Sequence, residues 1–148
     1  MLKLLLGFIL ISSAFAGARE EAQDILDRGA QVTGVANRLD AFSKMFIGRP
    51  YGFGGPLGEG PDGRYDQDPL YRFDTFDCTT YVETMTSLAL SRSVDEFEKT
   101  INDIRYENGE VDYLKRNHFT DLWWIPRNIA NGMLTDITKP LGGKRVLS

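Results

Sequence analysis

The stretch Phe73–Glu83, which reads FDTFDCTTYVE, decides the fold and contains the one cysteine of the chain, Cys78. Asp77 is a preferred N-cap residue, because its carboxylate can accept hydrogen bonds from the free amides of a first helical turn. Apolar residues then recur with the spacing of a buried helical stripe, at Val82, Met85 and Ala89. The pattern predicts a helix from Cys78 to about Leu90, with the thiol in its first turn.

The start of a helix is a favourable place for a reactive thiol. The positive end of the helix dipole favours the thiolate, and the thiolate is the nucleophilic form of cysteine. The opposing interpretation is that Cys78 is a small buried core residue without chemistry, as many free cysteines are. The stretch by itself leaves both interpretations open.

Residues 1–16 are typical of a secretory signal peptide. Lys3 supplies the positive charge, residues 4–11 are an apolar run too short to span a bilayer, and residues 14–16 (Ala-Phe-Ala) fit a cleavage site. A membrane anchor or a core helix is the alternative. We expect a signal peptide over 1–16, one domain over 17–148, and a periplasmic or secreted protein with no membrane span after cleavage. An unpaired cysteine in such an oxidising compartment favours a working residue.

The composition is that of a single soluble domain, with 42% hydrophobic and 26% charged residues. The net charge of −4 argues against nucleic acid as a partner, because binding phosphates needs a basic surface. One cysteine and one histidine can form neither a disulfide nor a Cys/His metal site, so we expect no cofactor and no metal. An acidic pair, Asp74 and Asp77, leaves a glycosidase as a distant alternative.

Most of the remaining chain has helical patterns, interrupted by a loop over residues 48–63 in which Tyr51 and Phe53 are either a cleft wall or an aromatic plug. The periodicity predicts helices over 18–30, 35–46 and from 94 to about 104. On the helix over 35–46 the predicted buried stripe is Val35, Leu39, Phe42 and Phe46. A hairpin is expected around Asn108–Gly109, from residues 104–106 and 111–113, and a strand over 133–137.

Four motifs together resemble one family: GRPY at 48–51, FDCTTYVE at 76–83, IRY at 104–106 and NHFTDLW at 117–123. The sequence is similar to the bacterial N-acetylmuramoyl-L-alanine amidase-like proteins, a branch of the NlpC-type, papain-like cysteine hydrolases, from about residue 28 to residue 138. The resemblance implies an α+β fold with the nucleophile at a helix N-terminus packed on an antiparallel sheet. It also implies metal-free hydrolysis of the amide between muramic acid and L-alanine, with a muropeptide or peptidoglycan as substrate.

The resemblance makes Cys78 the nucleophile and backbone amides at the helix start the oxyanion donors. The family's usual catalytic histidine lies on a downstream strand that this sequence lacks, so we expect an incomplete sheet and a domain truncated at its C-terminus. His118, the one imidazole, is then either a replacement base oriented by Asp121 or a residue that lines the site. Because of this departure, the alternatives to an amidase are a non-catalytic muropeptide-binding module and a degenerate remnant.

The remaining candidate site residues are expected to bind substrate, at Tyr51, Asp77, Thr79, Arg105, Tyr106 and Asp121. For Arg105 and Tyr106, binding of a peptide carboxylate or a sugar is one interpretation. The other is a pair on a surface strand, without contact to the substrate.

Overall fold

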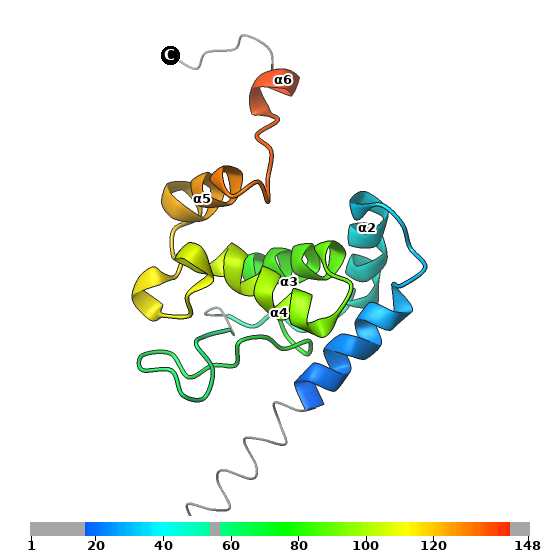
Figure 1. The fold of residues 1–148 in the computed structure, drawn as a ribbon, viewed down its shortest axis with the longest axis horizontal. Helices are drawn as coiled ribbons and strands as arrows, with labels where there is room; N and C mark the ends of the chain where they lie inside the picture. Colours follow the sequence, from blue (N-terminus) through cyan, green and yellow to red (C-terminus); the bar gives the residue numbers. More distant parts are fainter. Residues whose placement is uncertain (1–16, 54–56, 143–148) are drawn as a thin grey trace, which may run out of the picture.

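The structure is a computed structural model that describes residues 17–53 and 57–142. A helix over residues 17–28 is followed by α2 (Val35–Met45), α3 (Cys78–Leu90), α4 (Val94–Arg105), η1 (Glu107–Gly109), η2 (Tyr113–Lys115), η3 (Thr120–Trp124), α5 (Ile125–Ala130) and α6 (Thr138–Gly142). η1 and η2 are 3₁₀ turns and η3 is a π-helix. In Figure 1, α3 and α4 form the centre, with α2 and the helix over 17–28 toward one end and α5 and α6 toward the other.

The expected α+β, papain-like fold is wrong for the residues that the structure describes, because they form helices and no strand. Pairing of extended backbone is limited there to two isolated bridges, Tyr51 with Phe76 and Tyr106 with Arg116. The predicted hairpin fails because residues 104 and 105 still belong to α4. The turn signal itself is real, since Asn108 and Gly109 have positive φ angles of 56° and 71°, but they form η1. The predicted strand over 133–137 is irregular chain.

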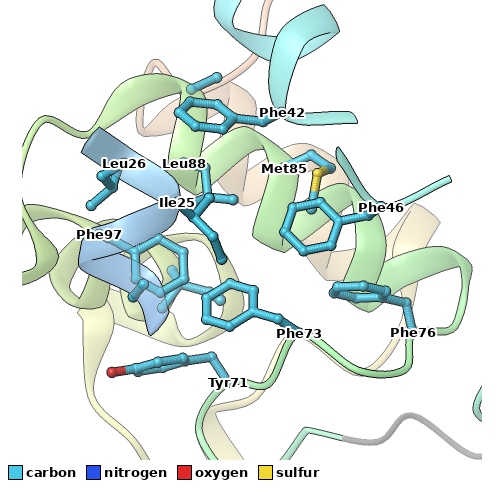
Figure 2. Packing of buried hydrophobic residues seen from close by; sticks show 13 residues of the cluster. Ile25, Leu26, Phe42, Phe46, Tyr71, Phe73, Phe76, Met85, Leu88 and Phe97 are labelled. Atoms are coloured by element: carbon cyan, nitrogen blue, oxygen red, sulfur yellow. The ribbon is translucent and has the colours of Figure 1, made fainter. Parts of the chain in front are cut away.

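Aromatic rings from the segment that leads into α3 are part of the core, together with rings and aliphatic side chains from the helices. Phe73 packs against Phe46 and Phe97, with ring centroids 5.9 Å and 6.0 Å away, and Figure 2 shows these rings beside Ile25, Met85 and Leu88. Phe76 makes an edge-to-face contact with Phe46 at 5.5 Å. Because Asp77 and Cys78 follow Phe76 directly, this ring cluster fixes the position at which α3 begins.

The helix α2 begins at its predicted residue and ends one residue before its predicted end, and it has only part of its predicted buried face. Phe42 and Phe46 are buried, whereas the side chain of Val35 is 53% exposed and Leu39 is also exposed. Arg38, one turn before Phe42, is buried instead. A charged residue at this position was missed by the periodicity analysis, because arginine is ordinarily assigned to the solvent-facing side of a helix.

Candidate active site at the start of α3

Cys78 is the first residue of α3, as the sequence predicted, and Asp77 is its N-cap. The Asp77 carboxylate accepts a hydrogen bond from the Thr80 amide at 2.7 Å, and the Thr80 hydroxyl accepts one from the Asp77 amide at 2.9 Å. The Asp77 carbonyl accepts from the Tyr81 amide. The amides of Cys78 and Thr79 take no part in these cap hydrogen bonds. They lie at the positive end of the helix.

The Cys78 thiol is exposed and free, which excludes the interpretation as a buried core residue. Its sulfur lies 3.9 Å from the Thr79 hydroxyl oxygen. Val82, one turn further on, is 47% exposed, so the side of α3 that carries Cys78 and Val82 faces outward. The buried side of α3 instead includes polar residues such as Thr84 and Ser87, which bond to carbonyls of the preceding turn.

An aromatic hollow of about 320 Å³ opens beside the thiol. It is lined by Phe46, Arg49, Pro50, Tyr51, Phe76, Asp77, Cys78 and Tyr81. The loop that carries Tyr51 is held there by the backbone, because the Gly52 amide donates to the Phe76 carbonyl at 2.8 Å. Tyr51 therefore forms a wall of this hollow, whereas the Phe53 ring is almost fully exposed and is no plug.

A second, polar hollow of about 310 Å³ adjoins the same helix start. It is lined by Asp66, Asp77, Thr79, Thr80, Tyr113, Arg116, Asn117 and His118. Asp77 belongs to both hollows, so the N-cap separates the aromatic hollow from the polar one. Of the predicted substrate-binding residues, Asp77 and Thr79 lie here and Tyr51 lies in the aromatic hollow.

The wall of the polar hollow depends on Glu59, which sequence reasoning missed. The Glu59 carboxylate accepts hydrogen bonds from the amides of Asp66 at 2.9 Å, Tyr65 at 3.0 Å and Tyr113 at 2.9 Å. These backbone hydrogen bonds, that of Asp66 first, hold the pKa of Glu59 below its ordinary value. Asp66 in turn pairs with Arg116 at 3.0 Å. A lone glutamate among glycines gives no sequence signal for such a role.

His118 lies in the polar hollow and is fixed by Tyr113. Its Nε2 is 2.7 Å from the Tyr113 carbonyl oxygen, and its ring centroid is 4.5 Å from that of Tyr113. Because a carbonyl oxygen only accepts, Nε2 must carry the proton, which leaves Nδ1 as the basic nitrogen of the neutral ring. Cys78 and His118 line different hollows, and Asp121 is exposed in the first turn of η3. The pairing of Cys78 with His118 stays a prediction.

Arg105 and Tyr106 are buried behind the site. Arg105 pairs with the buried Glu83 at 2.9 Å and donates to the Leu70 carbonyl at 2.6 Å. The Tyr106 hydroxyl donates to the Gly58 carbonyl at 3.0 Å, and burial raises its pKa. These bonds hold the loop over 57–70 against α4. Contact of either side chain with a substrate, as predicted, would require that loop to move.

The acidic pair does not have the properties of a glycosidase site. Asp74 is bonded to Arg72 by two contacts of 2.6 Å, and this hydrogen bonding holds the pKa of Asp74 below its ordinary value. A general acid needs a raised pKa. The Asp77 carboxylate is occupied by the helix cap. The structure therefore favours structural roles for both residues.

The described part of the chain contains neither a cluster of metal ligands nor a helix that could span a membrane. Residues 17–53 and 57–142 contain no group of three or more His, Cys, Asp or Glu side chains placed to hold a metal ion. None of the helices in that part of the chain has the length and apolarity that crossing a bilayer requires. The predicted signal peptide over 1–16 lies outside the described residues.

Comparison with known proteins identifies the family. The model of the N-acetylmuramoyl-L-alanine amidase-like family, AmiA-like, matches residues 41–147. A Legionella pneumophila protein of the DUF1460 family is 41% identical, with a TM-score of 0.81 over 86% of this chain and 42% of its own. An N-acetylmuramoyl-L-alanine amidase from Bacteroides uniformis is 26% identical, with a TM-score of 0.61 over 72% of this chain and 44% of its own.

Among curated proteins no match was found. The chain spans less than half the length of the two solved structures. The match of the family model to most of the sequence, together with the identity to the Legionella protein, is sufficient for assignment. The chain belongs to the N-acetylmuramoyl-L-alanine amidase-like family.

Proposed function

We propose that this chain hydrolyses the amide between the lactyl group of N-acetylmuramic acid and L-alanine in muropeptides, with Cys78 as the nucleophile. The observation that carries the proposal is the exposed, unpaired thiol at the first residue of α3 in a member of an amidase-like family. The relation to NlpC-type cysteine hydrolases is proposed for the chemistry alone, because the described part of the chain lacks the sheet of that class.

The proposed reaction has two steps. The Cys78 thiolate attacks the amide carbon and forms a C–S bond, which gives a tetrahedral oxyanion. The oxyanion then collapses to a thioester as the C–N bond breaks. The L-alanine amine takes a proton as it leaves. Water then hydrolyses the thioester, which releases the lactyl carboxylate and restores the thiol. The amides of Cys78 and Thr79 are the proposed oxyanion donors, because neither amide takes part in the hydrogen bonds of the Asp77 cap. His118 is the proposed proton carrier through Nδ1.

In this proposal the sugar and the stem peptide of the substrate occupy different hollows on the two sides of the start of α3. The aromatic hollow with Tyr51 offers a ring surface for the apolar face of a sugar. The polar hollow, with Thr79 and Arg116, offers donors for the carboxylates and amides of a stem peptide. In this proposal Cys78 sits between the glycan and the peptide, where the scissile amide lies.

The test is cleavage of N-acetylmuramoyl-L-alanyl-D-isoglutamine, followed by mass spectrometry of the released dipeptide. Replacing the nucleophile in Cys78→Ala should lower kcat by at least about 10³-fold, as loss of a catalytic nucleophile does in other hydrolases. Val82→Ala is the matched control, because it lies one turn away on the same exposed side of α3. Cleavage that survives in Cys78→Ala would falsify the cysteine mechanism.

A binding module without catalysis is the second candidate. The observation that favours it is the position of His118, which lines a different hollow from Cys78 and bonds the Tyr113 carbonyl. Calorimetric titration of the same muropeptide separates the two functions. Binding by both wild type and Cys78→Ala, with no dipeptide released by wild type, would support the module. Release of the dipeptide by wild type would exclude the binding module.

We also propose that the protein is exported, with residues 1–16 removed and residues 17–148 as the mature domain. A peptidoglycan substrate outside the cytoplasm fits this location. Fractionation of bacteria that express the whole chain, with N-terminal sequencing of the product, tests it. A periplasmic or secreted protein that begins at Gly17 is expected, and a full-length protein that begins at Met1 would contradict it.

A further inference from the structure

The aromatic hollow beside the thiol has two charged residues in its lining, Arg49 and Asp77. The Asp77 carboxylate is already occupied, because it accepts from the Thr80 amide at 2.7 Å and from the Thr80 hydroxyl at 2.8 Å. The Arg49 guanidinium is not used in this way. The charge that the hollow offers to a ligand is therefore positive.

Arg49 has no counter-ion among the residues that the structure describes. Its side chain is exposed and forms no hydrogen bond or ion pair with any of them. Asp74 lies within reach of its charge, because the pKa of Asp74 is lowered first by the hydrogen bond from Arg72 and last by the charge of Arg49. Asp74 is nevertheless paired with Arg72, at 2.6 Å. An arginine in this state can bind a carboxylate through two parallel hydrogen bonds.

The backbone that carries Arg49 is held on two sides. The Arg49 amide donates to the Phe46 carbonyl at 3.1 Å, just beyond the end of α2. The next carbonyl, of Pro50, accepts from the Phe76 amide at 3.3 Å and from the Thr75 hydroxyl at 3.1 Å. These bonds join the backbone of Arg49 to the segment that leads into α3. Little backbone ordering is then needed when a ligand binds, which favours affinity.

The remaining walls of the hollow are mainly rings in fixed positions. Phe76 makes edge-to-face contacts with Phe46 at 5.5 Å and with Tyr81 at 5.6 Å, and Figure 2 shows Phe46 and Phe76 together. The Tyr81 hydroxyl donates to the Ser43 carbonyl at 3.1 Å. A concave site with aromatic walls and a few polar groups is typical of small-molecule binding. Rings with a single available cation fit a sugar that carries one negative charge.

The proposed reaction produces such a sugar. In an intact muropeptide the lactyl group of N-acetylmuramic acid is an amide and carries no charge. Hydrolysis converts it to a carboxylate, and this carbon is the one that Cys78 attacks. Because Cys78 and Arg49 line the same hollow, the new negative charge forms beside the available cation. The charge of the hollow therefore matches the glycan product better than it matches the substrate.

We infer that the aromatic hollow binds the free N-acetylmuramic acid end of the cleaved glycan, with Arg49 as the counter-ion of the lactyl carboxylate. The bound product covers Cys78 and keeps the next substrate out, so the enzyme is inhibited by its own glycan product. The inference rests on the proposed function, because it takes the sugar of the substrate to lie in this hollow. Its test measures binding and needs no turnover.

The experiment compares ligands that differ in charge at one position. N-acetylmuramic acid, its methyl ester and N-acetylglucosamine, which lacks the lactyl group, are titrated separately into the full wild-type chain in a calorimeter. We expect the acid to bind at least about fivefold more tightly than either neutral sugar, the upper range for an exposed ion pair. High salt should reduce this preference, because it screens the charge of an exposed arginine.

A substitution assigns the preference to Arg49. In Arg49→Gln the acid and its ester should bind with equal affinity. Arg28→Gln is the matched control, because Arg28 is an exposed arginine on the helix over 17–28 and lies outside the hollow, and it should keep the preference of wild type. Thermal melting checks that both variants fold. If Arg49→Gln does not fold, the comparison of acid with ester in wild type still decides.

The position of the ligand is read from amide chemical shifts of the ¹⁵N-labelled chain. Addition of N-acetylmuramic acid should move the signals of Tyr51 and Gly52, at the aromatic hollow. Movement of the Asn117 and His118 signals instead would place the sugar in the polar hollow and overturn the inference.

Three further results would also overturn the inference. Wild type can fail to bind the acid, it can bind acid and ester equally, or Arg49→Gln can keep the preference for the acid. The proposed function is judged separately. A chain that prefers the acid but releases no dipeptide keeps the binding site and loses the cleavage reaction, and a chain that cleaves without this preference does the reverse.

Discussion

Arg38 shows how a single buried cation can hold two helices and a turn together. Its guanidinium donates to four backbone carbonyls, those of Gly29, Leu88, Ala89 and Ser91, at 2.5–2.9 Å. Three of these carbonyls belong to the C-terminal end of α3, where the helix dipole is negative. Desolvation lowers the pKa of Arg38, with the charge of Arg92 adding to the effect. The side chain acts as a C-terminal cap supplied by a different helix.

Replacing Arg38 should therefore be costly. We expect Arg38→Ala to lower the free energy of unfolding by about 3 kcal/mol, because it leaves buried carbonyls without donors. Urea unfolding followed by circular dichroism measures the change. Lys44→Ala is the control, since Lys44 forms an exposed pair with Asp40, and surface pairs of this kind contribute about 0.5 kcal/mol or less. Similar losses in the two variants would show that Arg38 is no cap.

For single residues, the sequence correctly predicted those whose hydrogen-bond partners are near neighbours in the chain. Asp77 and Cys78 could be placed correctly because a helix cap is a contact between near neighbours. The relation between Cys78 and His118 could not be predicted, because the fold of the 39 intervening residues decides which hollow each side chain lines. Glu59 and Arg38 were missed for the same reason, since all their partners are backbone groups distant in the sequence or outside any motif.

Among the elements, α3 combines a polar cap with an exposed cysteine as its first residue. The reciprocal bonds between Asp77 and Thr80 define its start, and the Ser91 amide bonds the Leu88 carbonyl at its end. Loss of an N-cap carboxylate removes the acceptor for the first-turn amides. The stability of the helix start and the position of Cys78 therefore depend on the same side chain.

We expect Asp77→Ala to lower the free energy of unfolding by about 1 kcal/mol, the usual effect of removing an N-cap. Asp77→Asn should keep most of this stability, because the amide oxygen can accept the same hydrogen bond. Urea unfolding gives both values. Asp62→Ala, at an exposed turn position, is the control and should be near neutral. A loss in Asp77→Asn equal to that in Asp77→Ala would mean that charge, and not capping, carries the effect.

The main helices could be predicted from the sequence, whereas the expected sheet was wrong for the residues that the structure describes. The patterns for α2, α3 and α4 are local, and those for α3 and α4 include a side-chain cap, such as Ser93, whose side chain accepts from the Glu96 amide. A strand is stable only with a partner strand, so its existence depends on distant residues. The segments around Asn108–Gly109 had the right turn residues, yet the chain from 104 to 105 completes α4.

For the molecule as a whole, the loop over 57–70 is what joins the site to the helices. Glu59 ties this loop to η2 through the Tyr113 amide, Tyr106 bonds Gly58, and Arg105 bonds Leu70. Glu83 connects α3 to α4 through Arg105 and to η3 through Trp124. The polar hollow is lined by three parts of the chain, which are the loop over 57–70, the start of α3 and residues 113–118.

The hydrogen bonds accepted by Glu59 predict that the fold loses stability in acid. The pKa of Glu59 is lower in the folded state, so its contribution to stability is present at neutral pH and is lost as the pH falls below about 4.3 and through the folded-state pKa. Glu59→Gln should be less stable than wild type at pH 7 and should lose less further stability on acidification.

Thermal unfolding between pH 7 and pH 3 measures this difference. The melting temperatures of wild type and Glu59→Gln should converge as the pH falls. Melting curves that stay parallel over the whole range would contradict the assigned role of Glu59.

The exposure of Cys78 has an evolutionary consequence. The exposed Cys78 side chain belongs neither to the buried core under α3 nor to the Asp77 cap, so its substitution should have little effect on folding. Selection on foldability would not retain the thiol, so only selection on chemistry could. If Cys78 is the nucleophile proposed above, descendants of this gene that no longer need the reaction would accumulate other residues at position 78 and would still fold.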